Sequence, residues 1–123
     1  MPSSYLSLHY HLIFSTKGRA PTIQPPMTTR LYEYIGGIIR DLGGSLLAGG
    51  GMPDHVHLLV RLPATKSLSD VLRDVKASSS KWIHEEFPAM AEFAWQTGYG
   101  AFTVSLSGLE DVKQYIAGQE NHH

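Results

Sequence analysis

The sequence contains no cysteine, few charged residues and no long apolar run. Without cysteine, disulfide bonds and thiolate metal sites are excluded among its 123 residues. No apolar run approaches the length that crosses a bilayer, and the N-terminus lacks the basic and apolar regions of a secretory signal. We therefore expect a cytoplasmic protein with no membrane association.

Positive charge is also scarce. Charged residues make up 17% of the chain and the formal net charge is −1. Domains that bind nucleic acid by bulk electrostatics are usually basic, so this balance argues against such a protein. A local basic groove is still compatible with it, because charge is placed residue by residue.

The apolar residues, 42% of the chain, are patterned over one domain, which we predict to be 1–123. Residues 4–16 alternate in polarity, which predicts a half-buried strand. The helices are expected over 31–42 and 68–87, and the further strands over 45–48, 55–62 and 101–105. Loops are expected over 17–26 and, rich in glycine, over 49–54. A last helix is expected from Ser107, where Glu110 three residues on completes a capping box. This order favours an α+β fold, a ferredoxin-like or RRM-like antiparallel sheet with helices on one face and a C-terminal helix after it. The other sheet face is then available for chemistry.

Two pairs of histidines lie two residues apart on predicted strands. The alternation over 55–62 places His55 and His57 opposite an apolar face, and two parallel imidazoles can share one divalent cation. Solvated or hydrogen-bonded histidines are the alternative. His9 and His11 form a rival pair that spacing alone does not distinguish. The position of His55 after a glycine-rich loop favours His55 and His57 as the metal pair, and we interpret His9 and His11 as a polar sheet face or as support for the site.

The last predicted helix places a tyrosine beside its apolar stripe. Tyr115 and Gln119 lie one turn apart on that border. A tyrosine there could attack a phosphate, and a glutamine could offer an amide oxygen to a metal. From this helix alone, a border tyrosine that packs its ring and keeps its hydroxyl in water is the favoured interpretation.

Five segments together resemble a known family. Residues 52–60, Met-Pro-Asp-His-Val-His-Leu-Leu-Val, resemble the signature of the single-tyrosine HUH transposases, which are encoded by small insertion sequences and by relatives associated with repetitive extragenic palindromes. Residues 11–17, 76–83, 95–102 and 112–123 resemble, in order, the first strand, the second helix, the approach to the fourth strand and the tyrosine helix of that family. The resemblance covers nearly the whole chain.

The resemblance implies a function and a set of site residues. His55 and His57 would be ligands of a catalytic Mg²⁺ or Mn²⁺, Gln119 the third protein ligand and Tyr115 the nucleophile. The family cleaves and rejoins single-stranded DNA with hairpin ends through a 5′-phosphotyrosine, as a homodimer in which the tyrosine helix of one subunit completes the site of the other. Gly118 lies between Tyr115 and Gln119 and departs from the expected pattern, because glycine has a low helix propensity.

Candidate DNA contacts come from the basic residues Lys17, Arg19, Arg61, Lys76 and Lys81. Trp82, Trp95 and Tyr99 are candidate stacking surfaces, although the place of Trp82 on an apolar stripe favours the core. Three other functions stay open. The net charge and the end of the chain at His123 favour a domesticated or truncated relative that holds hairpin DNA without completing transposition. A non-DNA metalloenzyme and a ferredoxin-like dimerisation domain without chemistry are the others.

Overall fold

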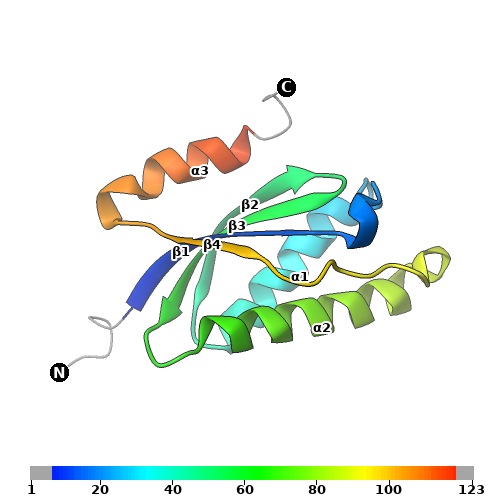
Figure 1. Cartoon of the computed structure of the whole chain (residues 1–123), viewed down its shortest axis with the longest axis horizontal. Helices are drawn as coiled ribbons and strands as arrows, with labels where there is room; N and C mark the ends of the chain where they lie inside the picture. Colours follow the sequence, from blue (N-terminus) through cyan, green and yellow to red (C-terminus); the bar gives the residue numbers. More distant parts are fainter. Residues whose placement is uncertain (1–6, 119–123) are drawn as a thin grey trace.

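The computed structural model describes residues 7–118, which build a four-stranded antiparallel sheet (Figure 1). The strand order is β2-β3-β1-β4. The strands are β1 (Ser7–Ser15), β2 (Ser45–Met52), β3 (His55–Pro63) and β4 (Gly100–Thr103). The predicted ferredoxin-like α+β sheet is confirmed, because the two longest strands, β1 and β3, pair at the centre and each also pairs with an edge strand.

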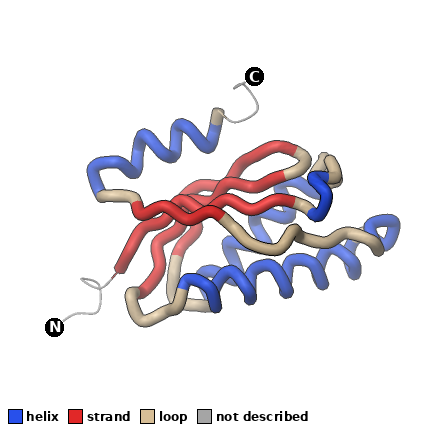
Figure 2. Tube along the Cα trace, viewed as in Figure 1, coloured by secondary structure: helices blue, strands red, loops and turns tan. Residues whose placement is uncertain are grey.

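The helices divide between the two faces of this sheet. Figures 1 and 2 show α1 (Met27–Asp41) and α2 (Leu68–Glu86) on one face, while α3 (Leu109–Ala117) lies across the other. Short 3₁₀ turns complete the chain as η2 (Lys17–Arg19), η3 (Pro88–Met90) and η4 (Leu106–Gly108). Over residues 7–118, every helix is too short or too polar to span a lipid bilayer.

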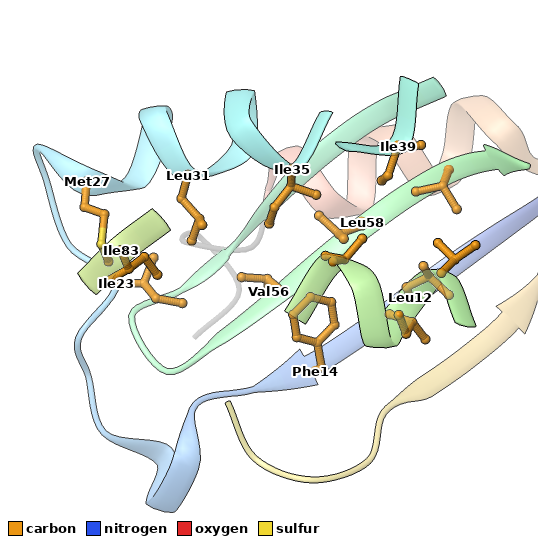
Figure 3. Close-up of a cluster of buried hydrophobic side chains, with 14 of the residues drawn as sticks. Leu12, Phe14, Ile23, Met27, Leu31, Ile35, Ile39, Val56, Leu58 and Ile83 are labelled. Carbon is orange, nitrogen blue, oxygen red and sulfur yellow. The ribbon is translucent and has the colours of Figure 1, made fainter. Parts of the chain in front are cut away.

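The hydrophobic core lies between the sheet and the pair α1 and α2. Leu31, Ile35 and Ile39 recur at helical spacing along α1 and point at the sheet (Figure 3). The sheet presents alternate residues to them, among them Leu58, which is fully buried. Burying each such side chain contributes about 1.5–3 kcal/mol, so this face of the sheet is committed to stability. The opposite face carries the polar alternates.

The prediction of a glycine-rich loop over 49–54 is wrong for residues 49–52. β2 continues to Met52, and only Pro53 and Asp54 form the turn into β3. A Cβ on Gly49 would lie 2.6 Å from Cδ1 of Tyr32, and one on Gly50 would lie 2.7 Å from the carbonyl oxygen of Ile116. Glycine occurs here because helices approach the strand from both faces, so its role is close packing.

The start of the last helix also differs from the prediction. Residues 106–108 form η4, and α3 begins at Leu109 with Gly108 at the N-cap position and no side-chain cap. The Ser107 hydroxyl instead lies 3.2 Å from that of Ser105, so the predicted capping box does not form. β4 ends at Thr103, two residues before its predicted end.

Candidate active site

His55 and His57 lie on the sheet face opposite the core, as the alternation predicts. Their ring centroids are 5.1 Å apart. Across the sheet, Ser15 pairs with His55 and Ile13 pairs with His57, so β1 flanks both histidines. α3 covers the same face and buries Ile116, and His57 is only 5% exposed beside it.

A third histidine joins the pair from β1. Nε2 of His11 lies 2.9 Å from Nδ1 of His57. Of the rival pair, His11 is therefore the residue that supports the site, while His9 pairs with Arg61 farther along the sheet. His9 and His11 share one face of β1, so the sequence pattern does not distinguish them. The register of β1 against β3 does.

Asp54 holds the other imidazole. Its Oδ1 lies 2.8 Å from Nδ1 of His55, and its Oδ2 accepts a hydrogen bond of 3.0 Å from Nε of Arg19. Burial by itself raises the pKa of Asp54, but the hydrogen bonds and positive charges of His55 and Arg19 lower it overall, so this group is a carboxylate. The sequence pattern does not predict this role for Asp54, because an aspartate before a strand is also an ordinary turn residue.

Two imidazoles of this cluster, those of His57 and His11, are held in their neutral form. The pKa of His57 is lowered to about 4, first because burial removes the ring from water and then because the charges of His11 and His55 disfavour another positive charge. Burial lowers the pKa of His11 as well. A neutral imidazole retains a lone pair, which is the form that binds a metal.

Tyr115 of α3 completes the cluster. Its ring centroid lies 5.8 Å from that of His57 and 6.0 Å from that of His11, and the residue is 46% exposed. The structure thus brings a tyrosine that solvent can reach to the predicted metal pair. Gln119, the predicted third ligand, lies outside the described residues. Within residues 7–118, no group of three or more His, Asp or Glu side chains is arranged to hold a metal ion.

The predicted DNA contacts do not form one patch. Lys17 and Arg19 lie in η2, at the end of the sheet that carries His55. Arg61 lies at the far end of β3 and donates to the hydroxyls of Ser7 and Ser45. Lys76 and Lys81 lie on α2. The ammonium of Lys76 donates hydrogen bonds to the carbonyl oxygens of Gln96 and Gly98, at 2.9 and 2.5 Å. The ammonium of Lys81 pairs with the carboxylate of Glu85 at 3.8 Å.

The aromatic side chains divide in the same way. Trp82 stacks on Tyr34 at 4.9 Å and packs against the core, as predicted. Trp95 also packs against the core, while Tyr99 is 43% exposed. Phe102, which the sequence analysis did not single out, is 57% exposed and lies 6.2 Å from the ring of His11. Its position opposite His11 in the β1–β4 register places it on the face of the histidines.

The chain is similar to transposases over almost its whole length. A family model described as IS200-like transposase matches residues 4–119. The ISDra2 transposase TnpA of Deinococcus radiodurans is 26% identical over 119 residues, which cover 93% of this chain and 85% of the relative. The transposase for insertion sequence element IS200 of Salmonella typhimurium is 27% identical over 120 residues, which cover 89% and 75%.

Solved structures show the same fold. A transposase from Deinococcus radiodurans superposes with a TM-score of 0.76 and 29% identity, over 92% of this chain and 91% of the other. A REP-associated tyrosine transposase bound to a REP hairpin superposes with a TM-score of 0.71 and 17% identity, over 94% and 68%. At that lower identity the second likeness concerns the fold alone.

Proposed function

Because the chain belongs to the IS200-like transposase family, we propose that it is a metal-dependent enzyme that cleaves and rejoins single-stranded DNA with Tyr115. The observation that carries this proposal is the ring of Tyr115, 5.8 Å from that of His57 within a cluster of three histidines. A tyrosine exposed beside neutral imidazoles on a sheet face is the arrangement that nucleophilic attack on a bound phosphodiester needs.

The residues present fit a divalent cation. The Nδ1 atoms of His55 and His57 are each engaged, by Asp54 and by His11, so Nε2 is the atom that each ring offers to a metal. The carboxylate behind His55 repeats a common arrangement around metal-bound histidines. We propose Mg²⁺ or Mn²⁺ as the cation, with Gln119 as the third protein ligand. When bound, the cation would neutralise charge on the scissile phosphate and polarise phosphorus.

The chemistry of the chain itself is a transfer of the phosphoryl group to tyrosine. The Tyr115 oxygen attacks phosphorus, the P–O3′ bond breaks, the tyrosine proton is released and the departing 3′ oxygen takes up a proton. The product is a 5′-phosphotyrosine and a free 3′-hydroxyl. Attack of another 3′-hydroxyl on the phosphotyrosine reverses these steps and rejoins DNA without ATP, because the bond energy is retained in the adduct.

Single-stranded DNA with hairpin ends is the proposed partner. The similar REP-associated transposase is bound to a hairpin, which supports this choice of DNA. Lys17 and Arg19 are the candidate phosphate contacts at the His55 end of the sheet. Arg61, Lys76 and Lys81 would contact DNA only outside the cluster, since Arg61 lies at the far end of β3 and the two lysines lie on α2, on the opposite face of the sheet (Figure 1).

An end-labelled hairpin oligonucleotide tests the proposal. In Mn²⁺, the wild-type protein is expected to give a covalent adduct on a denaturing gel, and EDTA should abolish it. Tyr115→Phe removes one oxygen and should give no adduct while hairpin binding persists. Tyr34→Phe is the matched control, since Tyr34 lies in the helical layer of the opposite face. An undiminished adduct from Tyr115→Phe would show that another residue attacks.

A binding protein without cleavage is the second candidate. The net charge of −1 and the small number of basic residues at the site favour it. The same reactions distinguish the two functions when they are also run on a native gel. A mobility shift of the hairpin without any adduct, in either metal, would replace the enzyme by a domesticated or truncated relative that only holds hairpin DNA.

A further inference from the structure

The imidazole of His57 is hydrogen-bonded by a second imidazole from the neighbouring strand. Nε2 of His11 lies 2.9 Å from Nδ1 of His57, whose side chain is buried. The ring of His11 also lies 6.0 Å from Tyr115 and 6.2 Å from Phe102. His11 is therefore enclosed by the proposed ligand, the proposed nucleophile and an exposed aromatic ring.

A hydrogen bond between two imidazoles depends on the position of one proton. One nitrogen must carry hydrogen and the other must offer its lone pair. If Nε2 of His11 carries it, a neutral His57 has its own proton on Nε2 and offers no lone pair there. If Nδ1 of His57 carries it, Nε2 of His57 keeps its lone pair. Only the second arrangement lets His57 bind a cation through Nε2.

We infer that His11 is a positioning residue that accepts the Nδ1 proton of His57 and so keeps the Nε2 lone pair of His57 available to a divalent cation. This inference rests on the proposed function. Metal-bound histidines generally donate their second N–H to a carboxylate, carbonyl or water. Here the two histidine ligands are supported by different groups, Asp54 for His55 and an imidazole for His57.

Three variants test this role by calorimetry with Mn²⁺. His11→Phe keeps a ring against Tyr115 and Phe102 but has no acceptor, so Mn²⁺ affinity should fall by about 10–100-fold. His11→Gln restores an acceptor oxygen and should recover part of that loss. His9→Phe is the matched control, because His9 lies on the same strand face opposite Arg61, and it should bind Mn²⁺ like the wild type. Unchanged affinity in His11→Phe would overturn the inference.

A measurement on the metal-free wild type needs no variant to fold. Long-range ¹H–¹⁵N spectra of the histidine rings report which nitrogen carries hydrogen, and His57 is expected as the Nδ1–H tautomer. An Nε2–H tautomer would overturn the inference whatever the variants do. A wild type that binds no Mn²⁺ and forms no adduct would instead overturn the proposed function, so the two failures are distinguishable.

Discussion

Each of the two histidines proposed as metal ligands depends on one neighbouring side chain. Asp54 is hydrogen-bonded to His55 and also paired with Arg19, which fixes the carboxylate from its other side. His11 does the same for His57 through a neutral ring. The two supports differ in charge, so their removal should have different consequences for the site.

Asp54→Asn should weaken Mn²⁺ binding. Asparagine keeps the shape and an acceptor oxygen, but the negative charge that makes His55 a stronger donor is lost, so affinity should fall by about tenfold. Calorimetry with Mn²⁺ measures this. Asp74→Asn is the control, because Asp74 is an exposed aspartate on α2 that pairs with Arg73. Equal losses in both variants would assign the effect to net charge and remove Asp54 from the site.

The metal-free protein should lose stability in acid through His57. Its pKa is about 4 in the folded state, mainly because of burial, and about 6.5 in the unfolded chain. As pH falls from 6.5 to 4 the unfolded state binds a proton that the folded state does not, so the free energy of unfolding decreases by up to about 1.4 kcal/mol per pH unit. The lowered pKa of His11 acts in the same direction.

Urea unfolding in EDTA between these pH values measures the effect. His57→Gln cannot take up this proton, so its stability should depend less steeply on pH than that of the wild type. Parallel curves for the two proteins would show that His57 is not the group responsible.

The position of α3 depends on Gly50 of β2, which has no side chain to separate the strand from the helix. At Gly50, β2 lies close enough to α3 that an added Cβ would meet the carbonyl oxygen of Ile116 at 2.7 Å. A backbone atom cannot rotate away as a side chain can, so α3 and β2 must move apart. The next residue back along α3 is Tyr115, and its distance from His57 is therefore coupled to β2.

Gly50→Ala should strongly reduce adduct formation while the protein remains folded. Overpacking at one site usually lowers stability by about 1–3 kcal/mol, and the displacement should move Tyr115 away from His57. Gly37→Ala on α1 is the matched control, since its Cβ would meet only the flexible end of Arg40 at 3.6 Å. That change should be neutral or stabilising, because alanine in a helix interior is favoured over glycine by about 1 kcal/mol. Thermal unfolding and the gel assay measure both; a fully active Gly50→Ala would show that α3 adapts.

At the scale of the whole molecule, the sheet has open edges. β2 and β4 each pair with one strand only within the described residues, and a cavity of about 890 Å³ lies beside β2 between α1 and α3, apart from the histidines. Exposed Phe102 and Leu106 lie on and beyond β4. Open edges and apolar side chains are surfaces on which a second copy can pack.

We expect a homodimer, and sedimentation at micromolar protein measures it. An active protein that stays monomeric would contradict this expectation. Mixing Tyr115→Phe with His57→Ala chains then tests whether the subunits share sites. The family resemblance implies that mixing restores the adduct, because one subunit supplies the tyrosine and the other the histidines. No restoration would show that each chain uses its own Tyr115, as the geometry within one chain allows.

Local sequence patterns predicted the fold class and the family of this chain. Period-two alternation over 55–62 separated the core residues of β3 from His55 and His57, and helical spacing predicted most of the buried face of α2. On α1 the same spacing predicted buried Leu31 and Ile35 but missed Ile39. These are local patterns, because the periods of strands and helices are properties of the backbone. The family motifs assigned the chain to transposases, which the matching family model confirms.

Which of these residues act together depends on the tertiary structure. His9 and His11 have the same local pattern, and the register of β1 against β3 brings only His11 to His57. The glycines of β2 were predicted to form a loop, but they lie in a strand that pairs with β3, and Tyr32 and Ile116 approach them from opposite faces. Strand register and helix approach join residues distant in the chain, so no local pattern carries them, and the packed sheet is what brings Tyr115 to the histidines.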